Sequence, residues 1–206
     1  ARGSLVGQAA MGLRAHSGWA VLVAVGGTVT APTVIQRRRI ELSDRGISGS
    51  VQPYHTAKPM KLEEAEAFLE RCDKSSIAMA RTAVQAAAVE LTKQGYQIAG
   101  SCILLSSGRT TKELAAVLAS HAAIHTAEGE FFRKALRSAC ESCGLAVSGV
   151  KERELFSRSA AALRMAPDEI ERRVSAMGKL VGPPWRQDEK LCALASWLVL
   201  VGSAND

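Results

Sequence analysis

The stretch "GLRAHSGWAVLVAVGG", residues 12–27, joins a short polar bend to an apolar run that ends in two glycines. Residues 18–25 are typical of a β-strand, and residues 33–42 predict a second one. The intervening "GGTVTAP" supplies glycines for a hairpin turn and a proline to close the loop. The stretch therefore predicts a strand preceded by a bend that carries the basic residue Arg14.

Outward from this hairpin, strand and helix patterns alternate. Residues 43–59 are a polar connection with weak signs of a third short strand. Residues 61–94 have helical spacing, and a break into two helices at 73–75 is left open. Further strands are predicted at 96–107 and 145–150. A capping box at 110–113 starts a helix that either continues or breaks near residue 120. Three more helices follow residue 151. This order predicts an α/β protein with a mixed sheet and helices on both faces.

Composition limits the class of protein. At 206 residues, with 47% hydrophobic and 22% charged residues, the chain fits one globular domain, and no run approaches the ~20 apolar residues of a membrane span. Five cysteines at irregular spacing do not form a disulfide framework, so we expect a reducing, cytoplasmic location. Residues 1–10 precede a methionine and are interpreted as a vector or processing remnant, which leaves 11–206 as a single domain.

Three segments carry a family resemblance: "GLRAHSGWAVLV" (12–23), "FFRKALRSACESCGLAVSGVKEREL" (131–155) and "IERRVSAMGKLVGPPWRQDEKLCALASWLVL" (170–200). In this order the chain resembles the ribonuclease H-like fold and, within it, the RuvC-type Holliday-junction resolvases. The resemblance implies a ribonuclease H-like mixed sheet and an activity that uses about four carboxylates to hold two Mg²⁺ ions.

The carboxylates that the resemblance implies are largely missing. The first-strand aspartate falls on Arg14, and the middle strand ends in "ILLSSGR", which offers only serines. On the last helix, Asp188 and Glu189 match the first acidic pair, whereas Cys192 replaces the final aspartate. Because an arginine repels Mg²⁺, we expect a degenerate member of the family without two-metal chemistry and without a resident cofactor.

One helical face offers a different candidate site. His121, His125 and Glu128 are spaced i, i+4 and i+7, so they share a face and could bind Zn²⁺ or take part in catalysis. The alternative is a helix junction at which these side chains make structural hydrogen bonds. The glutamate that follows the first histidine in the HExxH motif of metalloproteases is absent here.

A second candidate lies between a strand and a helix. Ser107, Gly108 and Arg109 fall where free backbone N–H groups favour anions, and together with Arg14 they form a predicted anion-binding set. An ordinary capped turn is the competing interpretation. The Cys140-x-x-Cys143 pair has no second pair or adjacent histidine, so buried helix cysteines are its simplest explanation.

Basic residues concentrate near the start of the chain. Residues 1–60 carry seven Lys and Arg against two acidic residues, a net charge of +5 within a total of +6. Arg37, Arg38 and Arg39 are candidates for contacting nucleic acid, and their replacement by alanine should then abolish binding. Guarding a strand edge against pairing with other chains explains them equally well.

These observations leave three hypotheses of function. The first is a non-enzymatic member of the family that binds nucleic acid or a protein. The second is a hydrolase or nuclease of altered chemistry, with its site formed by His121, His125, Glu128, Asp188 and Glu189. The third is a homo-oligomeric structural protein. The second hypothesis requires the structure to bring those five residues into one cleft.

Overall fold

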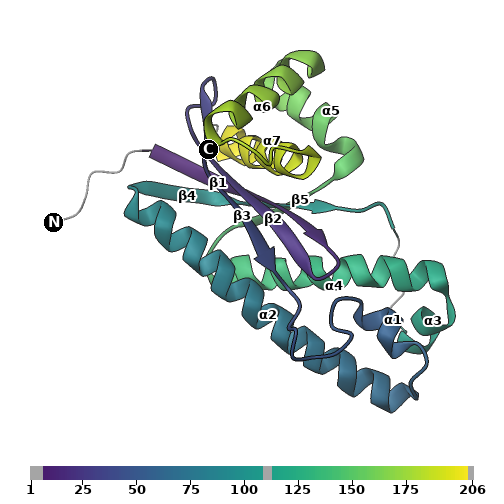
Figure 1. The fold of residues 1–206 in the computed structure, drawn as a ribbon. Coiled ribbons are helices and arrows are strands. Elements are labelled where there is room, and N and C mark those ends of the chain that lie inside the picture. Colours follow the sequence, from purple (N-terminus) through teal and green to yellow (C-terminus); the bar gives the residue numbers. More distant parts are fainter. Residues whose placement is uncertain (1–6, 109–112, 204–206) are drawn as a thin grey trace.

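The opening stretch spans a β-hairpin at the centre of the sheet in the computed structural model of the chain, which describes residues 7–108 and 113–203 (Figure 1). Strand β1 (Gly7–His16) pairs antiparallel with β2 (Trp19–Gly27). Gly18, in the two-residue connection, has a φ of 79°, a left-handed conformation that glycine adopts at little cost. The polar bend predicted before the strand is therefore the turn of a hairpin.

Three more strands complete a mixed sheet in the order β3-β2-β1-β4-β5. Strand β3 (Pro32–Glu41) is antiparallel to β2, whereas β4 (Tyr96–Leu105) and β5 (Val147–Lys151) run parallel to β1. Parallel strands end at the same side of a sheet, which is where ligands commonly bind in α/β proteins. We call the side at which β1, β4 and β5 end the carboxyl edge.

Helices cover both faces of this sheet, as the sequence predicts (Figure 1). On one face lie the long helices α2 (Leu62–Lys93) and α4 (His121–Ser142), with the short α1 (Pro53–Ala57) and α3 (Leu114–Ala119) beside them. The other face is covered by the last three helices, α5 (Glu152–Leu163), α6 (Pro167–Val181) and α7 (Gln187–Ser203).

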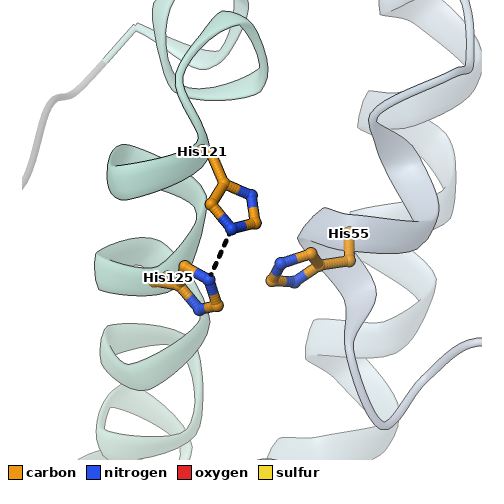
Figure 2. A group of neighbouring side chains, drawn as sticks. All are labelled: His55, His121 and His125. Atoms are coloured by element: carbon orange, nitrogen blue, oxygen red, sulfur yellow. Dashed lines mark hydrogen bonds between the residues drawn. The ribbon is translucent and has the colours of Figure 1, made fainter.

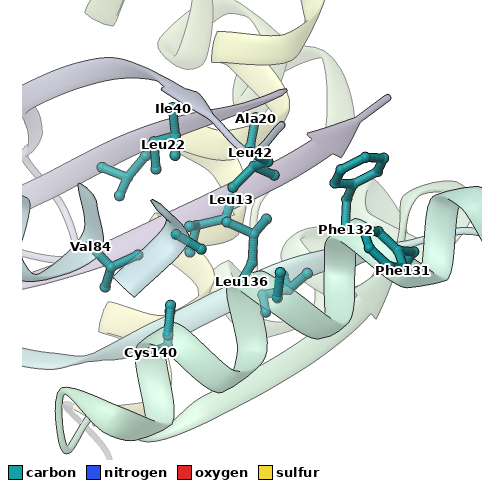
Figure 3. Close-up of a cluster of buried hydrophobic side chains, with 14 of the residues drawn as sticks. Leu13, Ala20, Leu22, Ile40, Leu42, Val84, Phe131, Phe132, Leu136 and Cys140 are labelled. Atoms are coloured by element: carbon teal, nitrogen blue, oxygen red, sulfur yellow. The ribbon is translucent and has the colours of Figure 1, made fainter. Parts of the chain in front are cut away.

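Each face of the sheet has its own hydrophobic core. Leu13, Leu22 and Leu136 belong to the core beneath α2 and α4 (Figure 3). On the opposite face, α7 packs directly on β1, since a Cβ added to Gly12 would lie 1.9 Å from the carbonyl oxygen of Cys192. Side chains alternate along β1, so Arg14, two residues after Gly12, lies on the face that α7 covers.

Residues 7–10 correct the expectation that the first ten residues stand outside the fold. They begin β1, and Ala9 and Ala10 are fully buried between β2 and β4. Residues 1–6 lie outside the described residues. The origin of this segment as a vector or processing remnant stays a prediction.

The helical segments differ from the sequence prediction at two places and agree with it at a third. Residues 43–59 contain α1, opened by Pro53, and no strand. Helix α2 is unbroken at 73–75, where Asp73 forms an ion pair with Lys134 of α4. The break near residue 120 is confirmed, since Ser120 caps α4 by accepting a hydrogen bond from the Ala123 amide. Most of the predicted capping box at 110–113 lies outside the described residues.

All five cysteines are free thiols. Cys140 is buried within α4, as the interpretation of buried helix cysteines predicts, whereas Cys143 directly follows the helix and is only partly buried. Among the helices of residues 7–108 and 113–203, none is both long and apolar enough to cross a membrane.

Candidate functional site

Arg14 holds the centre of an ion-pair network at the carboxyl edge. Its Nε and Nη2 atoms donate to the two carboxylate oxygens of Glu152, each at 2.9 Å. Its Nη1 atom donates to Asp188 at the start of α7. The hydrogen bonds to Glu152 contribute most to a raised pKa of Arg14, so the guanidinium is charged at every accessible pH. Arg14 therefore links two carboxylates of its own chain.

Aromatic and basic side chains continue this network across the hairpin. His16 Nε2 lies 3.1 Å from the second oxygen of Asp188, and its ring stacks on Trp19 with 4.2 Å between the ring centroids. The Arg39 guanidinium lies 3.9 Å from the centroid of Trp19. Arg39 pairs in register with Val21, which pairs with Arg14, so all three side chains share the face that α7 covers.

Glu189 and Cys192, the other two residues singled out on the last helix from the sequence, are buried and make structural contacts. Glu189 accepts a hydrogen bond from the backbone N–H of Arg186 at 2.8 Å, which caps α7. Cys192 lies against β1 and β2, with Sγ 3.5 Å from the carbonyl oxygen of Val21. Burial raises the pKa of this thiol well above its usual value, so Cys192 stays protonated near neutral pH.

The three consecutive arginines of β3 do not form one patch. Arg37 donates to the carbonyl oxygens of the turn at 182–184, between α6 and α7. Arg38 points to the opposite face of the sheet, where it forms an ion pair with Glu90 of α2. Arg39 is the most exposed of the ion-paired arginines on this strand and bonds Glu41 at 2.8 Å. Their role in nucleic-acid binding stays a prediction.

The predicted anion-binding set is divided in the structure. Arg14 reaches toward α5 and α7, whereas the loop after β4 packs on α4, since a Cβ on Gly108 would lie 2.8 Å from Thr126. Ser107 is exposed in this loop, and Arg109 lies outside the described residues. The two halves of the predicted set thus meet different helices on different faces of the sheet.

Three histidines converge on the other side of the molecule, between α1 and α4 (Figure 2). His121 and His125 approach with 3.0 Å between their Nε2 atoms, and the ring of His55 lies 4.8 Å from that of His125, centroid to centroid. One nitrogen of each ring lies within 4.8 Å of the others. Among the described residues, this is the one trio of His, Cys, Asp or Glu close enough to hold a metal ion together.

Glu128 is buried next to this trio and contacts one of its members, His55. Its Oε1 atom accepts from the backbone N–H of His55 at 3.0 Å and lies 3.1 Å from Nδ1 of the same residue. Burial raises the pKa of Glu128, although these hydrogen bonds oppose the shift. His121, His125 and Glu128 therefore lie on one helix, as predicted, but Glu128 forms its hydrogen bonds with a third histidine, His55.

The structure does not bring the five residues of the predicted altered enzyme into one cleft. His121, His125 and Glu128 lie on α4, on one face of the sheet, whereas Asp188 and Glu189 lie on α7, on the other. A cavity of about 360 Å³ between α1, α2, α3 and α4 has none of these five residues in its lining. The composite site therefore has no geometric basis, although each group can be tested alone.

Two residues of these groups were not predicted. Glu152 directly follows β5 and so falls at the carboxyl edge, a signal that the order of strands could have provided. His55 has no such signal, because it lies in a polar connection and reaches α4 only through the packing of α1. Local sequence patterns cannot show a contact of this kind.

No protein-family model matches the chain. No curated protein matches it in sequence either. Solved structures do match: RuvC of T. thermophilus in complex with a Holliday junction substrate aligns with a TM-score of 0.53 and 12% identity over 93% of this chain and 91% of RuvC. A second structure of Thermus thermophilus RuvC aligns with a TM-score of 0.52 and 11% identity over 93% of this chain and 92% of that one.

The similarity covers nearly the whole of both chains, and at this level of identity it bears on architecture alone. It agrees with the five-stranded mixed sheet, the parallel pairing of β1 with β4 and the helices on both faces. The chain therefore has a ribonuclease H-like fold that resembles the fold of RuvC.

Proposed function

We propose that this chain is a nucleic-acid-binding module in which the carboxylates of the carboxyl edge do not carry out metal-dependent cleavage. One observation carries the proposal: the Arg14 guanidinium donates to both Glu152 and Asp188. A two-metal site needs carboxylate oxygens that face Mg²⁺. Here a fixed positive charge occupies those oxygens and repels a divalent cation.

The choice of nucleic acid as partner rests on charge and on fold. The chain has a net charge of +6, and the RuvC structure of similar fold is described in complex with a Holliday junction. Exposed cations lie near the Arg14 network: the side chains of Arg39, Lys151 and Arg153 are 57%, 44% and 65% exposed. We call these three residues the edge cations. Their ion pairs with neighbouring glutamates are weak enough for phosphate groups to replace.

Fluorescence anisotropy with a labelled four-way junction, a duplex and a single strand, measured over a series of salt concentrations, tests binding. We expect affinity to fall steeply with salt, and replacement of the three edge cations by alanine to flatten the log–log slope by about 2–3. The matched control replaces three exposed cations of α2, Arg71, Arg81 and Lys93, and so removes the same charge from a different surface. Equal losses in the two variants, or binding insensitive to salt, would contradict the proposed surface.

The same DNA substrates, incubated with Mg²⁺ or Mn²⁺, test the second half of the proposal. We expect no cleavage. Metal-dependent cleavage that Asp188→Asn abolishes would overturn the non-catalytic assignment and favour a nuclease of altered chemistry. Failure to bind any of the three nucleic acids would instead favour a protein partner.

A further inference from the structure

We propose that His55, His121 and His125 form a site for one divalent transition-metal ion, with Zn²⁺ the expected occupant. The site is separate from the carboxyl edge and does not depend on the proposed nucleic-acid binding. Imidazole nitrogens are ligands that Zn²⁺ prefers, and three protein ligands with a fourth position for water form an open zinc centre.

The spacing of the ring nitrogens supports a metal. Ligand nitrogens 2.0–2.1 Å from a tetrahedral Zn²⁺ lie roughly 3.3 Å from one another. The Nε2 atoms of His121 and His125 are already 3.0 Å apart. One ring nitrogen of each of the three histidines lies within 4.8 Å of the other two. The three rings approach one another edge to face from α1 and α4 (Figure 2), so the ligand nitrogens of all three can be brought to one ion by rotation of the side chains.

Glu128 orients the third ligand. Its contact with Nδ1 of His55 leaves Nε2 as the ring nitrogen that can bind the ion. Histidines that bind metals usually donate their other ring N–H to a carboxylate, which fixes the ring and makes it a better ligand. The backbone N–H of His55 holds the same oxygen, so the carboxylate is fixed before any ion binds. Glu128 is itself buried and is thus a positioning residue for His55.

The surroundings leave room for a fourth ligand. His121 and His125 are exposed on α4, whereas His55 is half-buried and Glu128 is buried. Water therefore reaches the ion from the side of α4, while the opposite side is closed by protein. An ion bound here would also tie the short helix α1 to α4, because the ligands come from both helices.

Titration of metal-free protein, with any affinity tag removed, tests the site. We expect one Zn²⁺ per chain by calorimetry, and Co²⁺ should give the visible absorption of a four- or five-coordinate ion. At a free Zn²⁺ concentration of 100 times the Kd, the thermal midpoint should rise by about 5–10 °C. His121→Ala and His125→Ala, at exposed positions, should each weaken binding at least ~10-fold without unfolding the chain, and Glu128→Gln should weaken it about 10–100-fold.

The matched control is His16→Ala. The chain has four histidines, and His16 is the one outside the proposed site, on the other face of the sheet. We expect this variant to bind one Zn²⁺ with unchanged affinity. Less than one equivalent bound by the wild type, or binding that survives His121→Ala combined with His125→Ala, would overturn the proposal. If His55→Ala unfolds, the Co²⁺ spectra of the two exposed variants still decide the outcome.

Discussion

Arg14 on β1 forms an ion pair with Asp188 on α7, 174 positions further along the chain. The pair joins the central strand to the helix that covers it, beside the close contact of Gly12 with the backbone of α7. Glu152 binds the other side of the same guanidinium. The network thus connects β1, α5 and α7 at the carboxyl edge, and its stability can be measured apart from any function.

Arg14→Ala should lower the free energy of unfolding by about 1–3 kcal/mol. The side chain is 23% exposed, and its removal leaves two partly buried carboxylates without their shared donor. Urea denaturation at neutral pH measures the effect. Arg14→Lys should recover only part of the loss, because an ammonium cannot reproduce the two-pronged contact with Glu152. Equal stability of Arg14→Ala and the wild type would show that the network contributes nothing to folding.

Gly12→Ala should be among the most damaging single substitutions in the sheet, costing about 3 kcal/mol or more. A Cβ at this position would overlap the carbonyl oxygen of Cys192, and backbone on both sides leaves no flexible group to move. Thermal unfolding should show a midpoint lower by roughly 6–12 °C. Gly7→Ala is the matched control on the same strand, because a Cβ at Gly7 meets nothing within 4 Å. Similar midpoints for the two variants would argue against this close packing of α7 on β1.

Arg37 and Arg38 should differ in their effects on stability although they are neighbours. Arg37→Ala removes the donor to three carbonyl oxygens of the turn at 182–184, and we expect a loss of about 1–3 kcal/mol. Arg38→Ala breaks an exposed ion pair with Glu90 and should cost less than ~1 kcal/mol. Denaturation of the two variants side by side provides the comparison. If Arg38→Ala proved the more damaging, the assignment of Arg37 to the turn would be wrong.

The strands and helices with strong periodicity could be predicted from the sequence, and the exceptions have physical reasons. Strand β1 (Gly7–His16) was not predicted as a strand, because it is central and buried on both faces and uses small residues such as Ala9 and Ala10 in place of a β-branched run. The opening of α1 at Pro53 was missed within a polar connection. Helix α2 continues past Asp73, with buried residues Cys72 and Ser76 on either side of the predicted break.

The candidate sites depended more on tertiary contacts. The i, i+4 spacing identified His121 and His125, because both lie on one helix. His55, which lies 66 positions before His121 in the sequence, joins them through the packing of α1 on α4. Likewise, Arg14 could be matched to a family position, but its two partners come from α5 and α7. Residue spacing along one element is visible in a sequence, whereas a site assembled from several elements requires the fold.

Alkaline pH should destabilise the fold through its buried thiols. Burial raises the pKa of Cys140 to about 11, whereas a cysteine in the unfolded chain titrates near 8.5–9. Between these values the unfolded chain releases a proton that the folded chain retains, so the free energy of unfolding falls as pH rises. This thiol alone should account for about 3 kcal/mol once the pH passes 11. The pKa values of Cys102 and Cys192 are raised by burial too, and they act in the same direction.

Cys140→Ala isolates this contribution from the lysines and tyrosines that titrate in the same range. Urea denaturation of the wild type and the variant at about pH 8 and about pH 10.5 gives the difference between their free energies of unfolding at each pH. At the lower pH the variant should be the less stable, because it loses a buried side chain from the core beneath α2 and α4. At the higher pH the gap should narrow, since the variant has no thiol at this position to deprotonate on unfolding. A gap that is unchanged, or that widens, would show that the buried thiol of Cys140 does not resist ionisation.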